Sequence, residues 1–211
     1  GAYAGKVGEA ITVTAASSFD YDVGDSIVAY QWDLAGSGSF SAGSSTATVP
    51  AVNYVYQGQV GLKVQDSAGS WSLPKYADYF FSDKDAVATG VSVDSFGLSD
   101  ANVTVRLAIA VPSDSTGTLQ SLEARFFDGD PRTSGNAIGV LKTIDLSPGQ
   151  SGEVSISFPT SSRPPVIYAQ VDPVGKIFEW NEANNVVSAP VNPNYPPTNL
   201  TPSSSTVAEN Q

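Results

Sequence analysis

The feature that most constrains this chain is a strict alternation of apolar and polar residues, which is clearest from Asn102 to Val111. Every second residue there is branched and aliphatic: Val103, Val105, Leu107, Ile109 and Val111. A repeat of two residues is that of a β-strand with one buried face. The same pattern predicts strands at 11–14, 27–33, 60–65, 71–81, 122–126, 154–158, 166–171 and 185–191, whereas helical periodicity is nearly lacking. We therefore predict an all-β protein.

Turn residues and one polar break divide these strands into two groups. Ser82-Asp83-Lys84-Asp85 separates strands on either side, and the second group is expected to begin near Thr89. Sandwiches of short strands need about 100 residues each. We predict two tandem immunoglobulin-like β-sandwiches, at 1–82 and 83–191, followed by a Pro-rich tail at 192–211.

Charge and composition exclude several classes of function. The net charge of −11 argues against binding to nucleic acid, which selects basic surfaces. The chain has no Cys and no His, which removes the common zinc sites, cysteine nucleophiles and the Ser-His-Asp triad. No apolar run approaches the roughly 18 residues of a membrane span, so we expect no membrane insertion. The chain also lacks Met and begins Gly1-Ala2-Tyr3, so we interpret it as part of a longer protein.

The first predicted domain carries four ordered motifs: A-S-S-F-D-Y-D, I-V-A-Y-Q-W-D, Y-V-Y-Q-G and V-G-L-K-V-Q-D-S-A-G. In this order they resemble the PKD (polycystic kidney disease repeat) family over residues 1–80. The resemblance implies a seven-stranded immunoglobulin-like sandwich with Trp32 in its core. Positions that are acidic in many relatives are Ala35 and Ser37 here, which argues against a calcium loop after Trp32.

The second predicted domain contains F-F-D-G-D-P, A-I-G, L-S-P-G-Q-S, V-D-P and N-E-A-N-N. This order is similar to that of the CARDB family (cell-adhesion-related domain found in bacteria) over residues 88–191. It implies a second β-sandwich and a place outside the bacterial cell or on its surface. In the tail, the V-A-E-N segment resembles the opening of a cadherin-like repeat, of which only the start is present.

Three groups of carboxylates are candidate calcium ligands. Asp20, Asp22 and Asp25 share one loop, and carboxylates at such spacing can converge on Ca²⁺, which requires several oxygen ligands. Asp128 and Asp130 form a second pair, for which Asp-Gly-Asp-Pro turn chemistry is the alternative. Asp172, Glu179 and Glu182 could line a third corner, where the Asn-rich sequence also indicates a purely structural turn.

The sequence leaves other ligand-binding residues unknown. Trp71 and Trp180 lie beside polar residues and could stack on a sugar, or they could cover the core or a domain junction. Nothing places two acidic residues in one cleft, so we expect no enzyme activity.

The motifs favour spacer and interaction modules of a large secreted or surface-anchored bacterial adhesin, with no cofactor other than calcium. Neighbouring sandwich modules are the expected partners, together with a surface polysaccharide or protein ligand, and we expect a monomer. The alternative is an accessory region of an extracellular bacterial hydrolase, which presents or binds its substrate.

Overall fold

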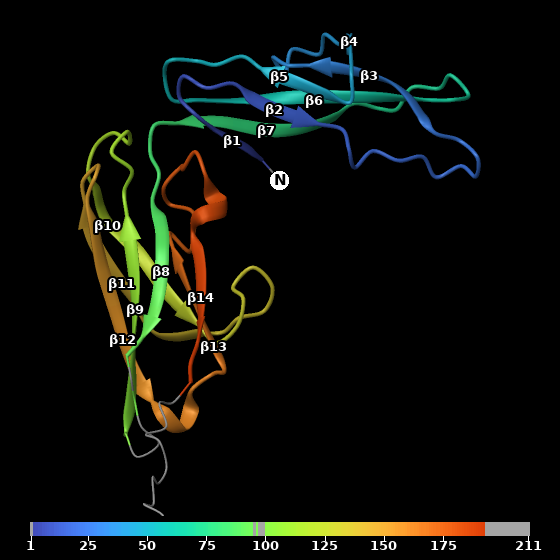
Figure 1. The fold of residues 1–211 in the computed structure, drawn as a ribbon. Coiled ribbons are helices and arrows are strands. Elements are labelled where there is room, and N and C mark those ends of the chain that lie inside the picture. Colours follow the sequence, from blue (N-terminus) through green and yellow to red (C-terminus); the bar gives the residue numbers. More distant parts are fainter. Residues whose placement is uncertain (1, 95, 97–99, 193–211) are drawn as a thin grey trace, which may run out of the picture.

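In the computed structural model, residues 2–94, 96 and 100–192 are described, and they form two separate β-sandwiches (Figure 1). The chain is therefore all-β, with two immunoglobulin-like sandwiches in tandem. The predicted tail module lies outside the described residues, except for Asn192.

The first sandwich packs a five-stranded sheet, in the order β1-β7-β6-β3-β4, on a two-stranded sheet of β2 and β5. Its strands are β1 (Tyr3–Lys6), β2 (Ile11–Thr14), β3 (Ile27–Asp33), β4 (Ser41–Gly43), β5 (Thr46–Val49), β6 (Tyr56–Asp66) and β7 (Lys75–Ser82). All pairings are antiparallel except that of β1 with β7, which is parallel.

The core of the first sandwich forms around Trp32 on β3, which lies between β6 and β4. Its indole is 6 % exposed and donates a hydrogen bond from Nε1 to the Ser44 carbonyl oxygen, at 2.9 Å. Val13, Val60 and Phe81 bury their side chains in the same cluster. The expected core position of Trp32 is confirmed.

The second sandwich packs a four-stranded sheet, in the order β11-β10-β13-β14, on a three-stranded sheet, in the order β12-β9-β8. Its strands are β8 (Val87–Val93), β9 (Asn102–Ala110), β10 (Leu119–Phe127), β11 (Ala137–Leu146), β12 (Ser151–Pro159), β13 (Val166–Val171) and β14 (Val186–Pro190). Two short 3-10 turns, Thr160–Ser162 and Glu182–Asn184, complete the domain. No helix in the described part of the chain is long and apolar enough to cross a membrane.

The alternation in β9 has the predicted consequence. Its aliphatic residues Val103, Val105, Leu107 and Ile109, and Val111 directly after it, are all at most 2 % exposed, while Thr104 and Arg106 on the other face are partly exposed. These residues join Leu122, Phe126 and Ile167 from the facing sheet in one core. The predicted buried face is confirmed.

Several predicted strand limits differ from those of the structure. The strand expected at 71–81 begins only at Lys75, because Pro74 lacks a donor for the ladder and Trp71 makes just an isolated bridge with Gln65. The second group of strands begins at Val87, two residues before the expected Thr89.

Candidate functional site

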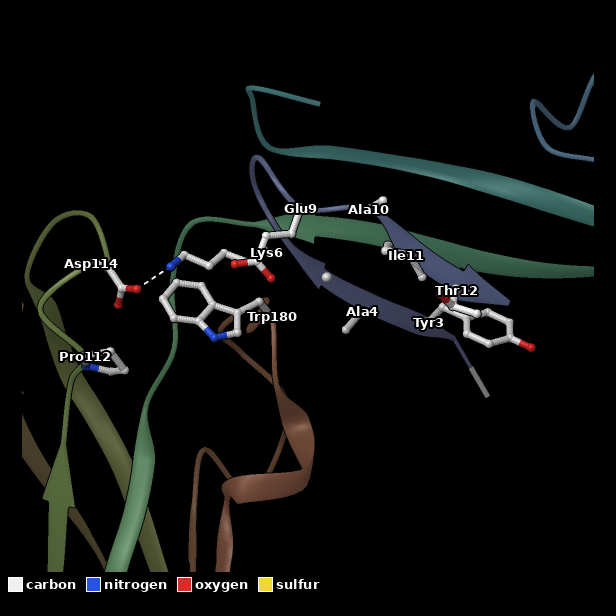
Figure 2. Close-up of a pocket in the computed structure, with 11 residues that line it drawn as sticks. Tyr3, Ala4, Lys6, Glu9, Ala10, Ile11, Thr12, Pro112, Asp114 and Trp180 are labelled. Atoms are coloured by element: carbon white, nitrogen blue, oxygen red, sulfur yellow. Dashed lines mark hydrogen bonds and ion pairs between the residues drawn. The ribbon is translucent and has the colours of Figure 1, made fainter. Parts of the chain in front are cut away.

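The two sandwiches meet at a cleft of about 570 Å³ between β1 of the first domain and two loops of the second (Figure 2). Lys6 reaches across this cleft and forms an ion pair with Asp114. Its Nζ atom also lies 5.0 Å from the centroid of the Trp180 ring, in cation–π geometry. The hydrogen bond between Lys6 and Asp114 raises the pKa of Lys6 and lowers that of Asp114, so both groups are charged at neutral pH. Trp180 therefore contributes to a domain junction.

The linker, residues 83–86, is bonded to the second domain along its length. The Asp83 carbonyl oxygen accepts the Thr116 N–H at 2.8 Å, and the Lys84 carbonyl oxygen accepts the Trp180 N–H at 3.0 Å. The Asp85 N–H donates to the Ser115 hydroxyl at 3.2 Å. Because these backbone groups are already paired, the linker has little freedom to swivel.

A second group of contacts links the last strand of the first domain directly to the second. Ser82 donates its hydroxyl hydrogen to the Phe178 carbonyl oxygen. The Phe178 ring packs edge-on against Phe80, with 5.7 Å between ring centroids. The loop after β13 thus contacts both the linker and β7.

At the opposite end of the first sandwich, the structure brings together some of the predicted calcium ligands. Carboxylate oxygens of Asp20, Asp25 and Asp66 all lie within 4.8 Å of one another. Asp22 is not in this group, and its N–H instead donates to Asp20 Oδ1 at 2.9 Å in an Asx turn. The cluster can hold a cation, since it places three anionic oxygens at one point.

Sequence reasoning missed Asp66. It ends β6, where the antiparallel pairing of Ile27 with Asp66 brings it beside the start of β3 and thus beside Asp25. The neighbouring Ser67 donates a hydrogen bond to Asp25, which ties the two turns together. Pairing the predicted strands 27–33 and 60–65 in sequence would have indicated this proximity.

Exposed aromatic residues surround this cluster. Phe19, Tyr21 and Trp71 line a groove of about 340 Å³ together with Asp20, Asp22 and Asp66. Tyr21 is 88 % exposed and Trp71 is 41 % exposed, and the Phe19 and Tyr21 rings contact edge to face with 4.7 Å between centroids. The exposed rings offer apolar stacking faces, and the carboxylates beside them offer hydrogen-bond acceptors.

The other predicted carboxylates have roles within turns. Asp130 forms a two-pronged ion pair with Arg132 at 2.8 and 2.9 Å, which lowers the pKa of its carboxyl. Asp128 accepts the backbone N–H of Asn136 at 2.7 Å and its side-chain amide at 3.2 Å. Both carboxylates are thus engaged in turn contacts at the β10–β11 connection.

Asp172 likewise shapes a loop. Its backbone adopts a φ of 43°, which Asp tolerates better than most residues. Its two carboxylate oxygens accept the N–H groups of Lys176 and Ile177, at 3.0 and 2.8 Å. It therefore closes the turn after β13 and has no carboxylate oxygen without a partner.

Glu179 and Glu182 lie in the following corner with three further polar residues. We refer to Asp85, Glu179, Glu182, Asn184 and Asn185 as the Glu/Asn corner. Asp85 is 2 % exposed, Glu179 is 0 % exposed and Asn185 is 2 % exposed. Burial, with the nearby charges of Glu182, Asp172 and Asp85, raises the pKa of Glu179 to about 8.

Neither a protein-family model nor a curated protein matches this chain. Solved structures with a similar arrangement include chitinase ChiA74 from Bacillus thuringiensis, at 12 % identity and a TM-score of 0.30 over 75 % of this chain and 25 % of that chain. Another is a carbohydrate-binding module of the β-sandwich superfamily, at 14 % identity and a TM-score of 0.30 over 76 % of this chain and 82 % of that one. The FN1–FN3 domains of chicken CNTN1 align at 13 % identity and a TM-score of 0.30, over 90 % of this chain and 66 % of theirs.

This chain thus spans only a quarter of the chitinase. Likenesses at these TM-scores carry no argument about function.

Proposed function

We propose that this tandem is a non-catalytic spacer and interaction module of a large secreted or surface-anchored bacterial adhesin. The observation that carries the proposal is the bonded junction, in which the linker and Ser82 are both hydrogen-bonded to the second domain. A spacer holds its neighbours at a fixed distance only when its own domains cannot swivel. The PKD-like and CARDB-like motifs support the same function and a place outside the cell.

Several weak contacts act together at this junction. An exposed ion pair such as Lys6–Asp114 is weakened by water and salt. The Phe80–Phe178 ring pair contributes about 0.5–1.5 kcal/mol. Domain motion is the default expectation for small interfaces, so the hydrogen-bonded linker is what distinguishes this junction.

We expect the two domains to keep one fixed separation in solution. The chain has no Cys, so spin labels can be placed at Thr48→Cys on β5 and Thr143→Cys on β11, both exposed strand positions. Double electron–electron resonance should then give a single narrow distribution of distances between the two labels. Adding Phe178→Ala and Asp114→Ala should broaden it, because the ring contact with Phe80 and the ion pair with Lys6 are lost.

Phe19→Ala is the matched control, since Phe19 is 63 % exposed and Phe178 is 62 % exposed, but Phe19 lines the groove beside Asp20 and not the junction cleft. It should leave the distribution narrow. A broad distribution in the labelled parent protein would contradict the spacer function.

The second candidate function is that of an accessory, polysaccharide-binding module of an extracellular hydrolase. The groove of Phe19, Tyr21 and Trp71 favours it, because these rings are exposed around hydrogen-bonding carboxylates. In this proposal, calcium at Asp20, Asp25 and Asp66 orders the loop that carries Phe19 and Tyr21.

The groove predicts calcium-dependent retardation in native gels that contain soluble polysaccharides such as glycol chitin or xylan. Trp71→Ala should abolish the retardation, because one aromatic platform contributes about 1–3 kcal/mol of stacking energy to a bound ring, by analogy with base stacking. Chelation should reduce the retardation of the parent protein and of Asp22→Asn. The Asp20→Asn variant should be only weakly retarded, with or without chelator. Equal mobility of Trp71→Ala and the parent in every polysaccharide would exclude binding at this groove.

A further inference from the structure

The Glu/Asn corner contains side-chain oxygens that no hydrogen bond satisfies. Four buried acceptor atoms have no partner in the described chain: Asp85 Oδ1, Glu179 Oε1, Asn184 Oδ1 and Asn185 Oδ1. Buried polar atoms in folded proteins are nearly always paired. Four acceptors without a donor at one corner therefore indicate a missing positive partner.

The donors of the corner are already in use. Asn184 Nδ2 donates to Asp85 Oδ2 at 2.9 Å. Asn185 Nδ2 donates to Glu179 Oε2 and, at 3.2 Å, to Glu182 Oε2. Each amide nitrogen thus donates to carboxylate oxygen, and each amide leaves its own carbonyl oxygen unpaired. Rotating either amide would turn its nitrogen away from the carboxylate and place its oxygen against that carboxylate instead.

No basic side chain neutralises the corner. Among the described residues, the ion pairs involve Asp83, Asp94, Asp114, Glu123 and Asp130, and none includes Asp85, Glu179 or Glu182. Lys84 and Lys176, the basic residues nearest in sequence, pair with Asp83 and Glu123. A buried carboxylate without a cation is strongly destabilising, so the corner requires either a proton or a metal ion.

We propose that the Glu/Asn corner binds a calcium ion through oxygens of Asp85, Glu179, Asn184 and Asn185. Calcium takes six to eight oxygen ligands from carboxylates and amide carbonyls, which are the atoms without partners here. The corner differs from the Asp20–Asp25–Asp66 cluster, which consists of carboxylates alone and is more exposed. Its amide ligands add oxygens without adding charge repulsion.

The position of this site gives it a structural consequence. Asp85 belongs to the linker, while Glu179 to Asn185 belong to the loop between β13 and β14. An ion shared by them joins the linker to the loop that also carries Phe178 and Trp180, which contact the first domain. Calcium would thus stabilise the second domain and hold the junction.

Calorimetric calcium titration of the whole chain tests the proposal. Asp20→Asn removes the cluster of the first domain, and this variant should still bind one equivalent of calcium. Adding Glu179→Gln, which keeps the shape but removes the charge, should lower the remaining affinity at least tenfold. Glu153→Gln, an exposed position on β12 of the same domain, is the matched control and should change nothing.

Thermal melting provides a second readout. In Asp20→Asn, calcium at 100 times its dissociation constant should raise the melting temperature of the second domain by about 10 °C. Glu179→Gln should remove that shift while melting close to the parent temperature in chelator, because the buried Glu179, with its pKa raised to about 8, is mostly protonated and uncharged there at neutral pH. If Glu179→Gln fails to fold, Asn184→Ala at a partly exposed position serves instead.

Three results would overturn the proposal: no calcium binding by Asp20→Asn, unchanged binding after Glu179→Gln, or equal affinity for magnesium. The first would mean that a proton, rather than a metal ion, neutralises the corner.

Discussion

Trp32→Ala is expected to unfold the first sandwich and leave the second folded. Truncating a buried aromatic residue costs roughly 3–5 kcal/mol, a large part of the stability of a domain of this size. Trp32 lies on β3 between β4 and β6, so its loss leaves a cavity in the core that the larger sheet covers. The Ser44 carbonyl oxygen also loses its donor.

Differential scanning calorimetry should show this as the loss of one of two transitions, because the two cores share no residue. Trp71→Ala is the matched control, since Trp71 is 41 % exposed and lies outside the core of the first domain. It should leave both transitions nearly unchanged. An unaltered first transition in Trp32→Ala would show that this side chain does not support the fold.

Asp33→Ala is expected to destabilise the same domain by about 1.5–3 kcal/mol, because it removes a charged acceptor that pairs with several backbone N–H groups of the following loop. Asp33 is 1 % exposed and accepts the N–H groups of Gly38, Ser37 and Ala35 at 2.6, 3.1 and 3.3 Å. Burial alone would raise the pKa of this carboxyl, but those donors outweigh it and lower the pKa. Asp33 thus organises the loop after Trp32 by hydrogen bonds.

The lowered pKa sets the pH dependence. The ionised form is favoured in the folded state, so its contribution is complete above the unfolded pKa of about 3.9 and is lost as pH falls through the folded value. Urea unfolding of the parent and of Asp33→Asn should therefore differ most near neutral pH and converge on acidification. If the difference in unfolding free energy between the parent and Asp33→Asn stays constant from neutral pH to about pH 2, this assignment is contradicted.

The strands could be predicted from the sequence because alternation depends only on local geometry. Ile27–Asp33 and Val166–Val171 have the predicted limits, and each carries apolar side chains that require one buried face. Ser41–Gly43 and Thr46–Val49 were not predicted, because segments of only three and four residues are too short for a clear alternation and are held extended by pairing with β3 and β2.

The candidate sites could be predicted only where their residues are close in sequence. Asp20 and Asp25 share a loop, but Asp66 joins them through the register of β3 and β6. Asp85 and Glu179 are brought together by tertiary packing at the junction, and no local pattern indicates it. The sequence indicates only a turn-forming role for the Asn residues of that corner. Their side-chain oxygens remain available as ligands, because no hydrogen bond pairs them.

The parallel pairing of β1 with β7 has a mechanical consequence. Tyr3 lies beside Tyr79 and Lys6 beside Ser82, and the Val7 N–H extends the ladder to the Ser82 carbonyl oxygen at 2.9 Å. Tension applied between Tyr3 and Ser82 therefore pulls the two strands along their lengths in opposite directions. The ladder bonds are loaded in shear and must break together, whereas an antiparallel pair pulled from one end would unzip bond by bond. The first sandwich is thus built to resist stretching along the chain.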